Sequence, residues 1–335
     1  MAAKLAQDAG LDRLLEIRTS NLVPIDQPLV LIAPRLARSG GSLLLQLLDS
    51  HPQLHVRPHE LRFGAGDTWP ALGMDAGTKR LFEQLRDDQI DRAFDDGYYH
   101  KDRPARRLGY ETEGFPMLLP PAFLRRIFLA LLESKPPKKA RAAFDAYFTA
   151  YFNAWLDNQN LYGGDRRWVV AFRAKLGTAE NVDAFLEDYP DGRHVSLVRD
   201  AKGWVASRLK LRDGSSADIS AALDLWTWAV EARLSLKERL GERMALVLFE
   251  TLIEETEHVM RGLADWLAID YDAQLLEPTF NRLPIRANSS FPTDRHGVLP
   301  ETVERWRGVL SRSDAELIDR KTGVLYERAR AASSF

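Results

Sequence analysis

The chain has 335 residues, of which 45% are hydrophobic and 28% are charged, a balance typical of soluble globular proteins. Its formal net charge of −2 gives no overall attraction to nucleic acid or anionic lipid, so an anionic ligand would need a local cluster of cations. The absence of cysteine excludes disulfides, thiolate zinc sites and a cysteine nucleophile.

The first segment, residues 1–19 (MAAKLAQDAGLDRLLEIRT), is charged and lacks the apolar centre and small-residue cleavage site of a signal peptide. No segment approaches the ~18 uncharged apolar residues that a membrane-spanning helix needs. We therefore expect a cytoplasmic protein with no membrane span and no nucleic-acid partner.

Four short segments are apolar at nearly every position, which is typical of strands covered on both faces of a parallel sheet. They are residues 29–33 (LVLIA), 168–172 (WVVAF), 194–198 (HVSLV) and 244–249 (MALVLF). Helical patterns follow at 42–50, 179–189, 202–211, 217–240 and 252–267. This alternation predicts an α/β fold with a central, mostly parallel sheet of about four to five strands.

The long stretch between the first two predicted strands shows no strand pattern. Helical patterns cover residues 79–92, 122–133 and 140–158, and prolines separate them. We predict a single domain over residues 1–335 in which residues 63–166 form a large helical insertion. Residues 281–299 are expected to form a long loop, and 300–310 and 313–331 to form helices.

The first predicted strand leads into a basic turn, Arg38-Ser39-Gly40-Gly41-Ser42, and a helix follows at about Ser42. The N–H groups and the dipole at a helix N-terminus attract anions, and the two glycines allow several N–H groups to converge. Arg38 adds a fork of charged donors and the serines add hydroxyls. We interpret the turn as a phosphate or sulfate site; the alternative is an ordinary strand–helix turn that contains glycine.

A second basic residue, Arg199, stands at the carboxyl end of the third predicted strand. Asp200 is placed to cap the next helix, and Ser207 follows about two helical turns after Arg199. Ligands in open parallel sheets bind beyond the carboxyl ends of the strands, so Arg199 and Ser207 could hold a second phosphate. The alternative is a surface Arg199–Asp200 pair and a serine without a role.

Together the two motifs resemble those of the sulfotransferases that use 3′-phosphoadenosine-5′-phosphosulfate (PAPS). RSGGSLLLQLLDSHP resembles the family's 5′-phosphosulfate loop, (R/K)SGTT(W/L), and is closest to the carbohydrate and tyrosylprotein branch. LVRDAKGWVASRLK resembles the 3′-phosphate motif. The similarity extends over residues 28–62 and 167–310. The chain departs from the family at Gly41 and Ser42, which replace two threonines, and at Phe249, which replaces a tyrosine.

The resemblance implies a P-loop-like, three-layer fold that takes PAPS as donor, releases 3′-phosphoadenosine-5′-phosphate (PAP) and needs no metal. It implies that residues 38–42 bind the 5′-phosphosulfate, with Arg38 at the bond that breaks, and that Arg199 and Ser207 bind the 3′-phosphate. Asn288 and Ser289, in the late loop, are expected near the phosphates.

The resemblance also implies further catalytic residues. Lys175 resembles a family lysine that reaches the bridging oxygen, with Arg173 as the alternative. Transfer needs a base for the acceptor proton, and family members use a Glu soon after the loop helix, here Glu60. The neighbouring His59 is the alternative, because the ordinary pKa of histidine is closer to neutral.

The acceptor is expected to be a hydroxyl of a small molecule, a carbohydrate or a lipid-like compound, bound in a pocket formed by the insertion. Aromatic side chains there, such as Trp69, Tyr147, Tyr151 and Phe152, would suit several such acceptors. A homodimer is possible.

Two other functions remain open. One is a P-loop kinase using ATP, which the lack of any Gly-Lys pair disfavours. The other is a non-catalytic nucleotide-binding protein of the same fold. The spacing of His51, His55 and His59 invites a metal interpretation, but Pro52 and Pro58 would break the helix that it requires.

Overall fold

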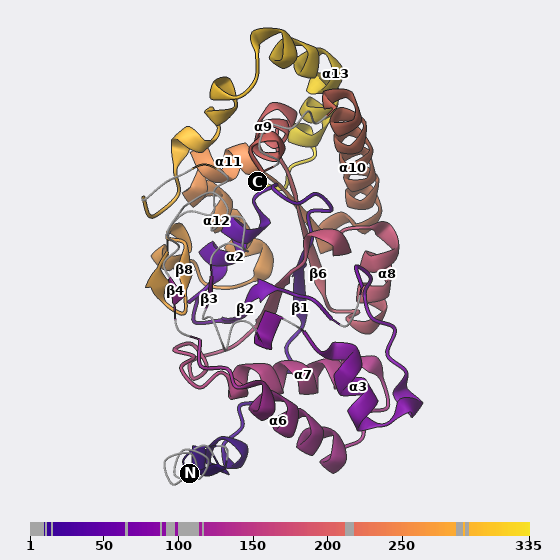
Figure 1. The fold of residues 1–335 in the computed structure, drawn as a ribbon, viewed down its shortest axis with the longest axis vertical. Helices are drawn as coiled ribbons and strands as arrows, with labels where there is room; N and C mark the ends of the chain where they lie inside the picture. Colours follow the sequence, from indigo (N-terminus) through magenta and orange to yellow (C-terminus); the bar gives the residue numbers. More distant parts are fainter. Residues whose placement is uncertain are drawn as a thin grey trace.

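A five-stranded parallel sheet forms the centre of the computed structural model (Figure 1). The structure describes residues 10, 12–14, 16–63, 66–87, 89–91, 98–99, 114–115, 117–211, 218–285, 291 and 295–335. The strand order is β2-β5-β1-β6-β7, and every pair of neighbours runs parallel. The strands are β1 (Leu29–Ile32), β2 (Leu54–Glu60), β5 (Trp168–Phe172), β6 (Arg193–Val198) and β7 (Met244–Leu248).

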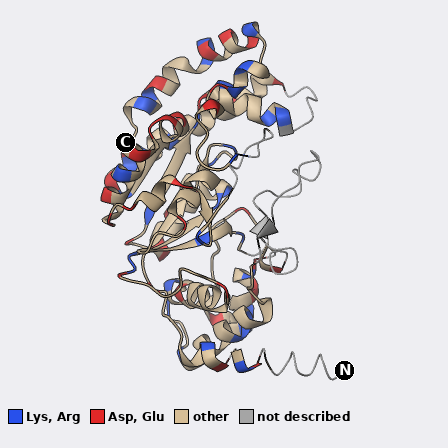
Figure 2. Cartoon of the chain, turned by 90° about the vertical axis from the view of Figure 1, so that its left-hand side faces the viewer, with Lys and Arg blue, Asp and Glu red and all other residues tan. Residues whose placement is uncertain are grey.

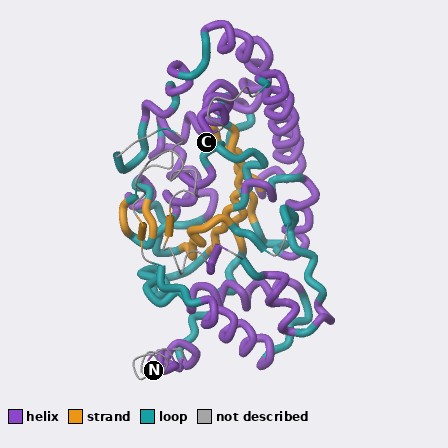
Figure 3. The backbone as a smooth tube through the Cα atoms, in the orientation of Figure 1, coloured by secondary structure: helices purple, strands orange, loops and turns teal. Residues whose placement is uncertain are grey.

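Both faces of this sheet are covered, which makes a three-layer α/β fold (Figure 3). Alternate residues of one strand point to opposite faces. In β1, Leu29 and Leu31 join one buried cluster, whereas Val30 and Ile32 join another. The predicted α/β class with about four to five parallel strands is therefore confirmed, and the four predicted apolar segments are all strands.

One face is covered by α2 (Gly41–Leu48), α11 (Phe249–Glu254) and α12 (Thr256–Leu267). The other face is covered by two groups of helices. The group over β6 and β7 is α9 (Ala201–Leu211), α10 (Ile219–Leu240) and α13 (Arg312–Ala331). The group that packs with β1 and β5 includes α3 (Thr78–Leu85), α6 (Pro121–Ser134), α7 (Ala140–Ala154) and α8 (Ala179–Asp188).

Strand β2 was not expected, and the prediction that no strand lies between the first two apolar segments is wrong. Its sequence, LHVRPHE, mixes polar residues and a proline, so it shows neither an apolar run nor a clean alternation. The strand lies at the edge of the sheet, and its register with β5 shifts between Val56 and Glu60. An edge position and an irregularity are where a sheet accepts a proline, here Pro58.

A buried ion pair joins this edge strand to the insertion. The Arg57 guanidinium pairs with the Asp87 carboxylate, which follows α3, and both side chains are fully buried. Arg57 Nη1 also donates to the His59 carbonyl at 2.6 Å, and Asp87 Oδ2 accepts from the Arg62 N–H at 2.8 Å. The pair therefore holds the backbone on both sides of Glu60.

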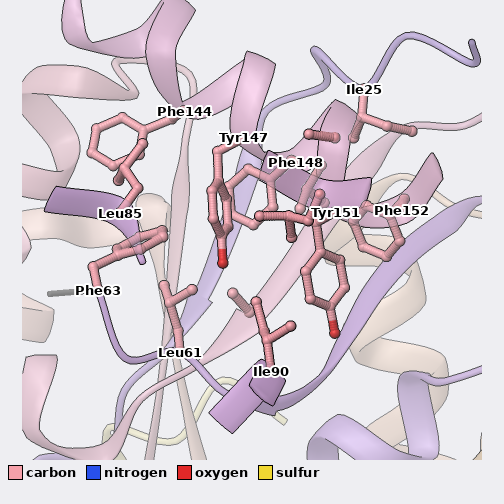
Figure 4. Packing of buried hydrophobic residues seen from close by; sticks show 14 of the residues in the cluster. Ile25, Leu61, Phe63, Leu85, Ile90, Phe144, Tyr147, Phe148, Tyr151 and Phe152 are labelled. Atoms are coloured by element: carbon pink, nitrogen blue, oxygen red, sulfur yellow. The ribbon is translucent and has the colours of Figure 1, made fainter. Parts of the chain in front are cut away.

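Several aromatic residues of the insertion are part of the core (Figure 4). The α7 rings of Tyr147 and Tyr151 are fully buried, and Tyr147 meets Phe63 edge to face with 5.2 Å between ring centroids. Trp69 and Phe152 are also buried. These four side chains from the predicted acceptor pocket are thus part of the core and are not available to a ligand. That the insertion forms the acceptor pocket stays a prediction.

The remaining elements are short. The insertion also contains the two-stranded β3 (Tyr98–Tyr99) and β4 (Gly114–Phe115), so it is not wholly helical. The predicted late loop contains part of a small ladder of β8 (Thr279–Phe280) and β9 (Leu283–Pro284). In place of the helix predicted at 300–310 there are two 3-10 turns, η5 (Pro300–Thr302) and η6 (Arg305–Gly308). Further 3-10 turns are η1 (Met74–Ala76), η2 (Ala174–Leu176), η3 (Gly241–Arg243) and η4 (Ala273–Leu276).

Among the helices in the described ranges, none combines the length and apolar character that crossing a membrane requires. Acidic and basic residues are interspersed over the outer helices (Figure 2), as the net charge of −2 suggests. Any strong positive field must therefore be local.

We expect Asp87→Ala to lower the free energy of unfolding by about 3–5 kcal/mol, because it leaves the Arg57 guanidinium buried without its carboxylate. Replacing both partners, Arg57→Met with Asp87→Leu, should recover most of that loss. Urea unfolding followed by circular dichroism measures both. As a control, Glu257→Ala removes an exposed pair with Arg261 and should cost about 0.5 kcal/mol or less. An Asp87→Ala protein as stable as wild type would contradict this.

Candidate active site

The basic glycine turn lies between β1 and α2, as predicted, and α2 begins at Gly41. Gly40 has a φ of 96°, and a Cβ there would come within 2.5 Å of the Phe249 ring. Arg38 also has a left-handed backbone, with a φ of 73°. This tight path brings the chain sharply into the helix, whose first N–H groups have no carbonyl one turn earlier to bond to. These groups are suited to an anion.

The two sequence motifs meet at this turn. Arg38 Nε donates to Ser207 Oγ at 3.1 Å, and Arg199 Nη1 donates to the Arg38 carbonyl at 3.2 Å. They meet because β1 and β6 are neighbours in the sheet, so their carboxyl ends lie side by side. Arg199 and Ser207 are 8% and 1% exposed, which contradicts the alternative of a surface pair and an unengaged serine.

Residues around Arg199 fix its position. Its guanidinium lies over the Phe249 ring, 4.3 Å from the ring centroid. Asp200 caps α9 as predicted, accepting from the Lys202 N–H at 2.8 Å and the Gly203 N–H at 3.4 Å. From α9, Trp204 Nε1 donates to the Ala37 carbonyl at 3.0 Å and so ties the helix to the turn.

The electrostatics of the site favour an anion. Burial, and secondly the neighbouring Arg199, lower the pKa of Arg38 to about 10. Burial also lowers the pKa of Arg199, against the opposing effect of Glu250. Arg199 Nε has no hydrogen-bond partner among the residues the structure describes. A bound anion would offset the desolvation and repulsion of both guanidiniums.

A pocket opens over the turn. Its lining includes turn residues, Arg199, Ser207 and three phenylalanines: Phe172, Phe249 and Phe291. Residues from far along the chain complete it: Ile253, Gly297, Val298, Leu299 and Thr302. The late loop, residues 281–299, was expected near the phosphates, and Gly297, Val298 and Leu299 belong to it. Sequence reasoning did not single out these residues, because glycine and aliphatic residues carry no chemical signature. The predicted Asn288 and Ser289 lie outside the described residues.

Glu60 stands at the carboxyl end of β2. Its Oε1 accepts from the Ala174 N–H at 3.3 Å and lies 3.8 Å from Arg173 Nε, and its Oε2 lies 3.4 Å from Arg62 Nη2. The Glu60 side chain is 26% exposed. Burial, and then Arg57, lower the pKa of the adjacent His59 to about 3. The argument for His59 as the base, which was a pKa near neutral, therefore does not hold in the folded protein.

Lys175 and Arg173 follow β5, the strand between β2 and β1. Both bind the Asp67 carboxylate, and Arg173 Nη2 does so at 2.5 Å. The Lys175 side chain is 64% exposed, whereas that of Arg173 is 8% exposed and also donates to the Leu61 carbonyl. Neither lines the pocket over the turn. Both nevertheless follow the carboxyl end of a strand, at the same end of the sheet as Glu60 and Arg38.

Within the described part of the chain, no group of three or more His, Asp or Glu residues is placed to hold a metal ion. His55 and His59 lie on β2 and not on a helix.

The fold is α/β, with a basic glycine turn at the carboxyl ends of its parallel strands. The chain belongs to the sulfotransferase family, because the model of that family matches residues 36–273. No curated protein sequence matches the chain significantly.

A comparison with solved structures finds several to which the chain is similar at low sequence identity. The domain from the Synechococcus PCC 7002 olefin synthase has 17% identity and a TM-score of 0.48, with 90% of this chain and 96% of that chain covered. The domain from the curacin biosynthetic pathway has 15% identity and a TM-score of 0.48, with 90% and 99% covered. Mouse sulfotransferase SULT7A1, solved with PAP, has 12% identity and a TM-score of 0.37, with 96% and 92% covered.

Glu250, behind Arg199, provides a test of the site's electrostatics. Its carboxylate accepts from the Asp200 N–H at 3.1 Å and the Tyr326 hydroxyl at 2.7 Å, and burial raises its pKa to about 7. The folded state thus binds a proton more tightly than the unfolded state. The stability that Glu250 contributes should therefore be lost as the pH rises from about 4.5 to about 7, because Glu250 must ionise while buried.

Glu250→Gln does not titrate, so its stability relative to wild type should rise by up to about 3 kcal/mol between pH 4.5 and pH 8. Urea unfolding of both proteins at these two pH values measures the change. A stability difference that is the same at both would show that Glu250 titrates normally.

Proposed function

We propose that the chain is a PAPS-dependent sulfotransferase that transfers the sulfuryl group to a hydroxyl by in-line displacement. One observation carries this proposal: Arg38 and Arg199, two guanidiniums with lowered pKa values, meet at one helix N-terminus together with Ser207. They come from two neighbouring strand ends, so the site offers two adjoining anion positions.

A donor with two separate anionic ends matches this arrangement. The 5′-phosphosulfate of PAPS would lie on the N–H groups of α2 and on Arg38, and the 3′-phosphate on Arg199 and Ser207. ATP carries its charge in one linear triphosphate and would leave the position at Arg199 and Ser207 without a phosphate. The turn also lacks the lysine that P-loop kinases place on the β- and γ-phosphates, which disfavours the kinase alternative.

In this proposal Glu60 is the base that takes the acceptor proton. Its carboxylate is partly exposed and is oriented by Ala174, Arg62 and Arg173, whereas His59 is buried and weakly basic. Arg38 would stabilise the charge that develops on the leaving phosphate. Lys175, or Arg173, would have to exchange Asp67 for the bridging oxygen in order to contribute.

The acceptor class stays a prediction: a hydroxyl of a small molecule, carbohydrate or lipid-like compound. A homodimer and a cytoplasmic location are likewise predictions.

The donor is tested by calorimetric titration with PAP, with adenosine 5′-monophosphate and with ATP–Mg²⁺. Wild type should bind PAP at least tenfold more tightly than either of the others. Arg199→Met should weaken PAP binding by at least tenfold but change binding of the monophosphate, which lacks the 3′-phosphate, much less. Arg38→Met should weaken both.

The matched control is Arg35→Met, three residues before Arg38. The Arg35 guanidinium lies 3.6 Å from the centroid of the Trp228 ring and does not line the pocket, so its loss should leave PAP binding unchanged. Tighter binding of ATP–Mg²⁺ than of PAP would contradict the proposal and favour the kinase.

The base is tested with Glu60→Gln, using acceptors found by a PAPS-dependent screen of hydroxyl compounds read by mass spectrometry. Loss of a general base should lower the transfer rate by about 10²–10⁴-fold and leave PAP affinity unchanged. His59→Ala is the comparison and should affect the rate far less. Full activity of Glu60→Gln would exclude Glu60 as the base.

A further inference from the structure

Gly41, the first residue of α2, is where the chain departs most from the sulfotransferase loop. Its φ is not in the left-handed region, so backbone conformation does not explain the glycine. Space does. A Cβ at Gly41 would lie 2.4 Å from Cε2 and 3.0 Å from Cδ2 of the Phe172 ring. No residue with a side chain fits at position 41 while this ring stays in place.

Phe172 ends β5, which lies between the strand that carries Glu60 and the strand that leads into the turn. Its Cα is the register partner of Ile32 on one side and Glu60 on the other. Its carbonyl accepts from the Leu61 N–H at 2.7 Å. The residue thus connects the anion turn to the proposed base.

Phe172 also borders the pocket in which we propose the donor binds. It lines the pocket over the turn together with Ser42 and Arg38. It therefore forms an apolar wall beside the place where anionic oxygens would bind, in the volume that a hydroxyl-bearing side chain at position 41 would otherwise occupy.

We propose that Phe172 determines how this chain binds the phosphosulfate end of its donor. The ring supplies the wall of the donor site and requires glycine at position 41, so the backbone N–H groups of α2 act without a hydroxyl there. Residues 41 and 172 form one size-matched pair. This inference rests on the proposed function.

The test is a double-variant cycle of Gly41→Thr, Phe172→Ala and the two combined, with PAP affinity measured by calorimetry. Gly41→Thr should weaken PAP binding by at least tenfold, because the threonine collides with the ring and displaces the turn. Phe172→Ala should weaken it less. The combined variant should bind PAP within about threefold of wild type, since the threonine then fills the space left by the ring. Such non-additivity is the signature of direct contact.

A second glycine provides a matched control. In α12, a Cβ at Gly262 would lie 2.4 Å from the Phe335 ring, the same clash away from the pocket. Gly262→Thr should lower the melting temperature but leave the PAP affinity of the folded protein unchanged. If Gly41→Thr does not fold, Gly41→Ala, which meets the same ring, takes its place in the cycle.

Two results would overturn the inference: a position-41 variant that binds PAP as tightly as wild type, or a combined variant that binds no better than that single variant. Failure of the wild-type chain to bind PAP would contradict the proposed function, and with it any role of Phe172 in donor binding. If the wild-type chain binds PAP but positions 41 and 172 show no coupling, only the role of Phe172 would be contradicted, and the proposed function would stand.

Discussion

The arrangement of the site depends on two positive charges held close together, one of them buried and the other partly buried. Arg38 and Arg199 reach the same helix N-terminus from neighbouring strand ends, and burial with mutual repulsion lowers the pKa of Arg38 to about 10. Such a pair is unfavourable in the empty protein. The surroundings hold it in place: Phe249 beneath Arg199, Trp204 on the turn and Ser207 on Arg38. We therefore propose that the site is preorganised for an anion of high charge.

The parallel sheet makes this possible. Its order places β1 and β6 side by side, so two motifs about 160 residues apart in sequence meet at the carboxyl ends of these strands. The same order places β5 between the turn and Glu60, so Phe172 joins the part of the site that we propose binds the donor to the part that we propose carries the base. The buried pair of Arg57 and Asp87 fixes the outer half by holding the backbone around Glu60.

Much of this arrangement could be predicted from the sequence, because its signals are local. Continuous apolar runs predicted four strands, and the resemblance of the Arg199–Ser207 segment to the 3′-phosphate motif indicated that it lies beside the turn. Strand β2 was not predicted, because its burial depends on specific partners, such as Asp87 for Arg57, and not on an apolar pattern. The fit of Phe172 against Gly41 and the low pKa of His59 are properties of packing, which no spacing rule contains. Within the late loop, the lining residues Gly297, Val298 and Leu299 could not be singled out, because glycine and aliphatic side chains carry no chemical signature.

The central claim is that one ligand with two separate phosphate groups bridges Arg38 and Arg199. A crystal structure of the chain with PAP tests it most directly. We expect the 5′-phosphate on the N–H groups at the start of α2 and on Arg38, and the 3′-phosphate on Arg199 and Ser207. A structure with either phosphate outside this site, or with the nucleotide bound elsewhere on the chain, would contradict it.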